Sequence, residues 1–258
     1  MSSLSAHVEG IGFWSKGLPG WAEARAFAQS GELPENAPAK PSPQLLAPNE
    51  RRRAPESVAV ALQVALAACQ AACRDPATLP SVFTSTHGDL AITDYMSETL
   101  AGDDPAAISP TRFHNSVHNA AAGYWTIGAG CMRPATAVSA YTASFAQGLL
   151  EALAQLEAGE DAVLLVAYDT GAPGPLAEVS PTTGVLGAAL VLSKSGAGPR
   201  IDARLEDGTA SPDDGPLALR DAGNAMRPML PFFDALAAGA AGVALDAGAG
   251  RVLHISLG

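Results

Sequence analysis

The sequence predicts a layered α/β fold, in which helices cover both faces of a β-sheet. Segments with strand and helix patterns alternate along the chain, which is typical of this class. Residues 162–167, AVLLVA, form a continuous apolar strand, as expected for a sheet buried on both sides. Residues 55–74 are rich in Ala, Val and Leu nearly all round, which indicates a buried helix. No clean linker interrupts the 258 residues, so we expect one domain over 1–258.

The first half of the chain is punctuated by proline and by short polar turns. Five prolines between residues 30 and 49 predict a surface loop, and Pro55 suits the first turn of the helix that follows. His87-Gly88-Asp89 reads as a turn. The expected elements are a strand at 6–14, helices at 21–28 and 55–74, a strand at 81–86, and a helix at 90–100.

The second half continues the alternation of helices and strands. Residues 187–193 and 201–205 are expected to form an antiparallel pair joined by a short loop. Residues 206–217 read as an acidic loop. The other expected elements are helices at 119–127, 144–156 and 229–238, and strands at 136–141, 162–167 and 252–257.

Charge and cysteine content indicate the cellular compartment of the protein and the classes of partner that it can bind. The formal net charge is −11 and the pI is about 4.8, whereas nucleic-acid binding needs a basic surface. Three cysteines suit a reducing compartment. The first residues lack the regions of a signal peptide, and no apolar run is long enough for a membrane span. We therefore expect a cytoplasmic protein with no nucleic-acid partner and no membrane span.

No motif for a cofactor or a metal is evident. A Gly-rich dinucleotide loop does not follow the first strand. Cys69 and Cys73 share a helix face, but no second Cys or His pair accompanies them. His114 and His118 would share a face of a helix, yet no third ligand is obvious. We expect no cofactor and no metal, and assign both histidines to a pocket, an interface or packing.

Residues 108–152 are the most informative part of the chain. They read as a loop, a helix of small residues, a strand, a sharp turn and a second helix. This order can lift one residue into a buried pocket above a sheet, where its chemistry decides whether covalent catalysis occurs. No cysteine stands at the turn, because the nearest one, Cys131, precedes the strand.

Residues 45–200 resemble the amino-terminal half of a β-ketoacyl synthase of the thiolase superfamily. Ile108-Ser109-Pro110 begins the loop, and Asn119 to Gly123 is similar to the family's helix motif N-x-x-A-G. Gly159-Glu160-Asp161 before AVLLVA resembles the family's G-D-x-D and its apolar strand. Gly130 and Pro134 stand where the family has Gly and Pro, and Arg51-Arg52-Arg53 is similar to its basic turn before a helix. The resemblance implies a thiolase-like α/β/α fold, truncated relative to a full ketosynthase.

The resemblance also implies where the family's nucleophilic cysteine would stand. Counting from Pro134 without a gap gives Thr142, with Ser144 matching the family's serine, and a one-residue gap gives Tyr141. The family's two catalytic histidines come from a second half of the chain. Only about fifty residues follow Ser211, and their one histidine, His254, lies in a strand-like segment. No catalytic set can be assembled on this pattern.

We therefore expect a non-catalytic relative, similar to the small chain-length factor of aryl polyene synthesis. The resemblance implies a heterodimer with an active β-ketoacyl synthase that works on an acyl carrier protein. It places Phe113, His114, His118, Tyr141 and Thr142 at the acyl pocket or tunnel. Tyr124 and Trp125 are large side chains beside small ones, which predicts an interface. A core role is the alternative for both. The interface residues are Ile108, Pro110, Tyr124 and Trp125.

Other interpretations remain open at the turn. Thr142 and Ser144 are suited to capping the helix that starts there, and Tyr141 suits either a pocket or a strand core. A thiolase-fold acyltransferase or hydrolase could instead use Thr142 or Ser144 with His87 or His118 as its base. A homodimeric scaffold is the third possibility.

Overall fold

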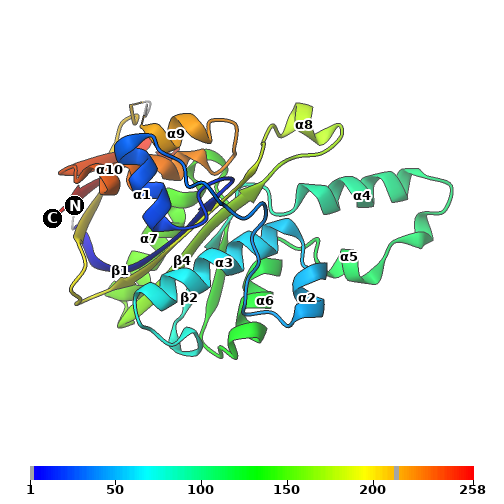
Figure 1. The fold of residues 1–258 in the computed structure, drawn as a ribbon, viewed down its shortest axis with the longest axis horizontal. Helices are drawn as coiled ribbons and strands as arrows, with labels where there is room; N and C mark the ends of the chain where they lie inside the picture. The colour runs from blue at the N-terminus through cyan, green and yellow to red at the C-terminus, as the bar shows by residue number, and fades with distance from the viewer. Residues whose placement is uncertain (1–2, 212–214) are drawn as a thin grey trace.

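The computed structural model describes residues 3–211 and 215–258, and its centre is one eight-stranded mixed sheet (Figure 1). Strands β3, β2 and β4 are parallel to one another, and every other neighbouring pair is antiparallel. The sheet order is β3-β2-β4-β5-β1-β6-β8-β7. The strands are β1 (Leu4–Ser15), β2 (Ser81–Thr84), β3 (Ala135–Val138), β4 (Ala162–Thr170), β5 (Val185–Ser193), β6 (Arg200–Asp207), β7 (Gly242–Gly248) and β8 (Arg251–Leu257).

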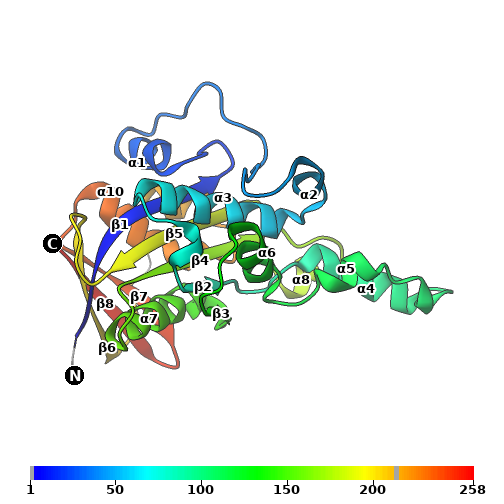
Figure 2. The same cartoon turned by 90° about the horizontal axis from the view of Figure 1, so that it is seen from below.

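Helices cover both faces of the sheet (Figures 1 and 2). The long helices are α3 (Glu56–Ala71), α4 (Leu90–Ala101), α6 (Ala120–Ala129) and α7 (Ser144–Glu157), with α1 (Trp21–Ser30) and α10 (Leu230–Ala238) near the termini. The short ones are α2 (Pro48–Arg53), α5 (Pro110–His114), α8 (Leu176–Val179) and α9 (Pro216–Arg220). Four 3₁₀ turns are also described, at Pro76–Thr78, Pro105–Ala107, Tyr141–Ala143 and Arg227–Met229.

The central strand β4 shows why the fold needs two helical layers. Val163, Leu165 and Ala167 face the core beneath α7 and α10, whereas Leu164 and Val166 face the core beneath α3 and α6. All nine residues of β4 are buried, because successive side chains point to opposite faces and both faces are covered. The layered α/β/α arrangement expected from AVLLVA is therefore confirmed.

The expected pairing of the two strands after residue 185 is wrong. Strands β5 and β6 are consecutive in the chain, but β1 lies between them and pairs antiparallel with both. Strand β1 extends over twelve residues, longer than expected, and its first residues reach β6 while its later ones follow β5. A short connection favours a hairpin, but local sequence cannot show that a strand from the other end of the chain is inserted.

Several elements differ from the sequence-based expectation. Strand β3 ends at Val138, three residues before the expected end. Helix α2 begins at the end of the proline-rich segment, with Pro48 at its first position. The edge strand β7 and the short helices α5, α8 and α9 were not expected, because each is too short or too glycine-rich to show a clear period. Part of the expected acidic loop, residues 212–214, lies outside the described residues.

Two features of the shape position the site. Helices α4 and α5 form an arm that projects from the body of the molecule (Figures 1 and 2). The sheet also curls around α7, so that Gln147 on α7 donates a hydrogen bond to the Ala247 carbonyl on β7 at 2.6 Å. Across the residues that the structure describes, none of the helices combines the length and apolarity that a bilayer crossing requires.

Candidate functional site at the turn between β3 and α7

The turn between β3 and α7 is sharp and strained. Tyr141 is its apex, with a backbone φ of +53° that residues other than glycine rarely adopt. This conformation costs about 1–2 kcal/mol. Ser144 Oγ stabilises the turn by accepting a hydrogen bond from the Ala140 N–H at 3.0 Å and donating one to the Tyr141 carbonyl at 2.7 Å. The Tyr141 side chain is 68% exposed, so it is neither a core residue nor a strand residue.

The Thr142 hydroxyl is held by a residue from the far end of the chain. Its Oγ1 donates to Oδ2 of Asp246 on β7 at 3.1 Å. The expected helix cap is therefore wrong for both hydroxyls, because α7 begins at Ala143 and Ser144 without a side-chain cap. Ser144 bonds back into the turn, and Thr142 bonds across to β7.

A buried carboxylate lies at the end of β4, at the same edge of the sheet as the turn. Asp169 is 1% exposed and accepts hydrogen bonds from Ser85 Oγ at 2.7 Å, from the Thr86 N–H at 2.9 Å and from the His87 N–H at 3.3 Å. Burial raises the pKa of the Asp169 carboxyl, and these hydrogen bonds only partly oppose that shift. Asp169 thus fixes the loop that follows β2.

The loop after β2 lies against the turn and closes it from one side. Thr86 Oγ1 donates to the Tyr141 carbonyl at 3.4 Å, and Ser139 Oγ donates to the Thr86 carbonyl at 3.0 Å. The His87 ring lies edge-on to the Tyr141 ring, with 6.4 Å between the ring centroids. These contacts pack the loop against one side of the apex, while Tyr141 stays largely exposed. Asp89, the last residue of the expected turn, caps α4 by accepting from the Ile92 N–H at 2.9 Å.

The predicted hydroxyl–imidazole pairs are not formed between the described residues. Nε2 of His118 lies 3.0 Å from the Ser85 carbonyl, and His87 contacts Tyr141. The hydroxyls of Thr142 and Ser144 are bonded elsewhere, as described above. A serine or threonine nucleophile needs an adjacent base to remove its proton, and neither histidine is placed to accept it from either hydroxyl in this arrangement.

The two candidate histidines do not share a helix face, which corrects the sequence-based expectation. Helix α5 ends at His114, and His118 lies in a following turn. His114 is exposed, whereas His118 is half-buried against Ser85. Within the described residues, 3–211 and 215–258, no group of three or more His, Cys, Asp or Glu side chains is placed to hold a metal ion.

The predicted interface residues separate into exposed and buried positions. Pro110 is exposed at the start of α5, and Ile108 and Tyr124 are half-buried. Trp125 is fully buried and packs against Phe83, with 6.4 Å between the ring centroids. The interface assignment of Trp125 is therefore corrected to a core role, because a partner cannot reach its side chain. Phe113, on the arm, is 59% exposed.

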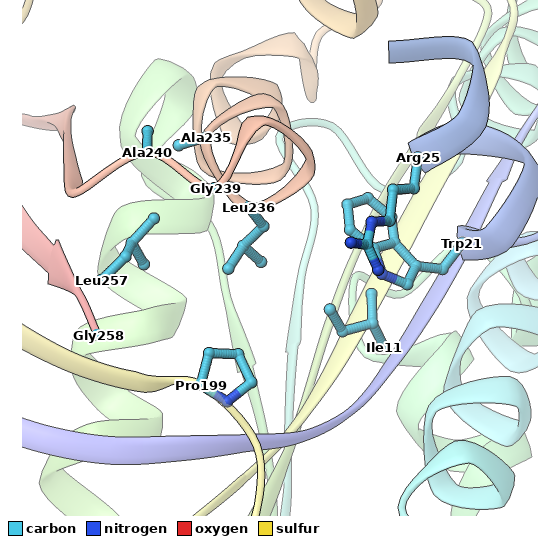
Figure 3. A pocket seen from close by; sticks show the side chains of 10 residues that line it. All are labelled: Ile11, Trp21, Arg25, Pro199, Ala235, Leu236, Gly239, Ala240, Leu257 and Gly258. Atoms are coloured by element: carbon cyan, nitrogen blue, oxygen red, sulfur yellow. The ribbon is translucent and has the colours of Figure 1, made fainter. Parts of the chain in front are cut away.

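A cavity of about 350 Å³ lies away from the turn, between β1, α1 and the end of α10 (Figure 3). Ile11, Trp21 and Leu236 form its apolar walls, and Arg25 extends along one side (Figure 3). None of the residues predicted for the site lines this cavity. A second, mostly apolar cavity of about 300 Å³ is lined by Val117, Tyr124 and Ile127, together with His114 from the arm.

Solved structures of several ketosynthase complexes match this fold over nearly the whole chain. One comes from the ketosynthase ApeO in complex with its chain length factor ApeC from Xenorhabdus doucetiae, with 25% identity, a TM-score of 0.77, and coverage of 98% of this chain and 99% of that one. Another comes from the ishigamide ketosynthase/chain length factor, with 16% identity, a TM-score of 0.73, and coverage of 98% and 99%.

The third structure is AntDE:AntF, a type II PKS acyl-carrier protein in complex with its ketosynthase bound to the hexaketide. Its identity is 13%, its TM-score is 0.71, and the match covers 100% of this chain and 99% of that one. These similarities confirm the thiolase-like fold that the sequence resemblance implied. A search of curated proteins gave no match.

The sequence itself matches a family model over most of its length. The model describes the N-terminal domain of β-ketoacyl synthases, and it matches residues 21–250. This range includes both sides of the turn, the arm and every described strand except β1 and β8, which lie outside it. The chain is therefore a member of the β-ketoacyl synthase family, built on the fold of that family's N-terminal domain.

Proposed function

We propose that the protein is a non-catalytic ketosynthase-like subunit, a chain-length factor, that pairs with an active β-ketoacyl synthase. The observation that carries this proposal is the turn itself: it has the strained shape that presents a residue, but its residues are Tyr141 and Thr142. A thiol ionises near neutral pH and forms a reactive thioester. A threonine hydroxyl is far less acidic than a thiol, and the Asp246 carboxylate that it contacts is a much weaker base than an imidazole.

The surroundings of the turn support an inactive role. The hydroxyl of Thr142 is bonded to Asp246, and the loop after β2 is fixed by Asp169. In an acyl-transfer enzyme the nucleophile lies beside a base and beside donors for the developing oxyanion. Here the groups beside the apex are bonded to one another, which favours a structural function for the turn.

The distribution of exposed apolar side chains favours a protein partner. Among the residues that the structure describes, nine large hydrophobic residues are prominently exposed, and five of them lie between residues 113 and 141. The same segment includes β3, which is an edge strand of the sheet. An edge strand leaves backbone groups free to pair with another chain, and a concentrated apolar surface is typical of an obligate interface. The five residues are Phe113, Val117, Ile127, Met132 and Tyr141.

The arm suggests how such a subunit acts on the product. Phe113 projects from α5 with more than half of its side chain exposed. We propose that the arm enters the acyl tunnel of the partner ketosynthase, where Phe113, His114 and His118 limit the length of the chain. A closed cavity excludes a longer chain by steric overlap, which costs about 1–3 kcal/mol once packing is tight. The substrates are then acyl chains carried by an acyl carrier protein in polyketide, aryl polyene or fatty-acid-like elongation.

The proposal is tested by co-expression with an active β-ketoacyl synthase from the same source. We expect a heterodimer in which elongation depends on the partner's cysteine, and no turnover by this chain alone. Native mass spectrometry gives the stoichiometry, and product analysis gives the chain length. Turnover of an acyl thioester by the isolated chain, abolished by both Thr142→Ala and Ser144→Ala, would support the hydrolase or acyltransferase alternative. A stable homodimer that does not bind the ketosynthase would support the scaffold alternative.

A further inference from the structure

The second cavity is an apolar groove on helix α6. It has a volume of about 300 Å³ and lies between α6 and the segment that leads into α2. Ile127 is 82% exposed and Val117 is 51% exposed at its rim, so the groove opens to the surface. Exposed apolar concavities of this kind are usually covered in the functional assembly. The other apolar residues that line it are Leu46, Ala120, Gly123, Tyr124 and Gly128.

Packing within this chain does not explain why position 123, in the groove, is a glycine. It stands in the interior of α6, where glycine is a poor helix former compared with alanine. A Cβ atom at Gly123 would meet nothing within 4 Å. By contrast, a Cβ at Gly128, five residues later, would come to 3.0 Å from the Leu45 side chain. The chain's own packing therefore explains Gly128 but leaves Gly123 unexplained.

The charges at the rim limit what can occupy the groove. Glu50 lines one end, and its carboxylate makes no ion pair with the side chains that the structure describes. No lysine or arginine lines the groove, and its other polar lining residues are His114 and Asn119, so Glu50 carries its one carboxylate. An apolar group with a cation beside it fits both the walls and the carboxylate. An open groove at the small end of the range for ligand pockets suits bulky side chains better than an extended acyl chain.

We propose that this groove receives a bulky apolar side chain of the partner subunit, with a lysine or arginine of the partner beside it facing Glu50. The inference rests on the proposed heterodimer and locates one contact within it. The groove contains two of the five exposed apolar residues named above, Val117 and Ile127, and its helix α6 contacts the edge strand β3. Gly123 keeps the floor of the groove open, so that the incoming side chain packs against the backbone of α6.

The test fills the groove without disturbing the fold. Gly123→Leu places a side chain where the structure leaves space, and Gly123→Ala fills it only slightly. The matched control is Ala154→Leu, which adds the same side chain at an exposed position of α7. Glu50→Lys reverses the charge at the rim. The heterodimer Kd is measured for each variant by calorimetry, and thermal unfolding of each isolated subunit checks that it is folded.

We expect Gly123→Leu to weaken pairing by roughly tenfold or more, since a lost well-packed contact changes the Kd by that order. Gly123→Ala and Ala154→Leu should pair like the wild type, and Glu50→Lys should weaken pairing several-fold. An unchanged Kd for both Gly123→Leu and Glu50→Lys overturns the inference while the heterodimer stands. Normal pairing of Gly123→Leu with a shorter product also overturns it, because the groove then holds the acyl chain. A wild-type chain that does not pair refutes the proposed function itself.

Discussion

The Thr142 hydroxyl and the Asp246 carboxylate are joined by a hydrogen bond of 3.1 Å, although 104 positions separate them in the chain. The bond connects the turn after β3 to β7, the strand at the opposite end of the sheet order. The bond forms because the sheet curls around α7, so that the turn after β3 and strand β7 lie close together. The hydroxyl of Thr142, which is at the nucleophile position in the ungapped alignment, therefore has a structural role: it links the turn to β7.

Replacing Thr142 by valine should leave elongation by the heterodimer unchanged. The substitution removes the hydrogen bond to Asp246 but keeps the shape of the side chain, so we expect a loss of about 0.5–1.5 kcal/mol in the free energy of unfolding. Urea denaturation measures the stability, and product analysis of the complex measures the activity. Asp246→Asn is the matched variant, because its amide oxygen can still accept the bond and the loss should be smaller. A folded, paired Thr142→Val complex without activity would contradict this assignment.

Asp169 should make stability depend on pH in a specific direction. Its pKa is raised in the folded state by burial, so folding favours the protonated carboxyl. The unfolding free energy should therefore rise, relative to Asp169→Asn, as the pH falls from about 7 toward the unfolded-state pKa of about 3.9. Below that value the difference should stay constant. Urea titrations of both proteins across this range measure it, and a difference that shrinks on acidification is the opposite of the expected result.

Trp125 should behave as a core residue in the isolated subunit. It is fully buried against Phe83, and truncation of such a side chain typically costs about 3–5 kcal/mol. We expect Trp125→Ala to lower the thermal unfolding temperature strongly before any partner is added, whereas Trp125→Phe should cost less. Differential scanning calorimetry of the subunit alone checks this. If Trp125→Ala keeps its unfolding temperature and loses only pairing, the residue belongs to the interface.

Phe113→Ala should lengthen the product of the heterodimer without abolishing synthesis. Phe113 lies exposed on the arm, so its truncation should cost the isolated subunit less than about 0.5 kcal/mol. Removing the ring should leave room for further extension at the end of the acyl tunnel. Mass spectrometry of the products from wild-type and variant complexes gives the comparison, with Leu100→Ala, another exposed residue on the arm, as the control. An unchanged product distribution in a fully formed complex argues against the length-limiting role.

Much of the site was accessible from local sequence, but its internal contacts were not. The sequence located the strand, the turn and the helix around Thr142, and it showed that no cysteine stands there. It left the apex open between Tyr141 and Thr142, and the backbone φ of +53° places the strain at Tyr141. It suggested that Ser144 and Thr142 cap α7, whereas both hydroxyls bond elsewhere. Capping is a local preference, and contacts with distant residues override it.

The buried carboxylate Asp169 was missed because it ends an apolar strand and no motif marks it. The only local signal is a charged residue directly after AVLLVAY, at the carboxyl end of a strand buried on both faces. Its partners, from Ser85 to His87, come from the loop after another strand. Parallel pairing of β2 with β4 brings them together, and that pairing is not evident from either segment alone.

The sequence by itself determined the layered class of the fold, the family resemblance and the absence of a thiol at the turn. These depend on side-chain period, residue order and residue identity, which are written locally along the chain. Only the tertiary structure decided that β1 separates β5 from β6, that Trp125 is core, and that Asp246 reaches Thr142. Each of these depends on which distant segments share the sheet, and that choice is made by burial of the whole chain at once.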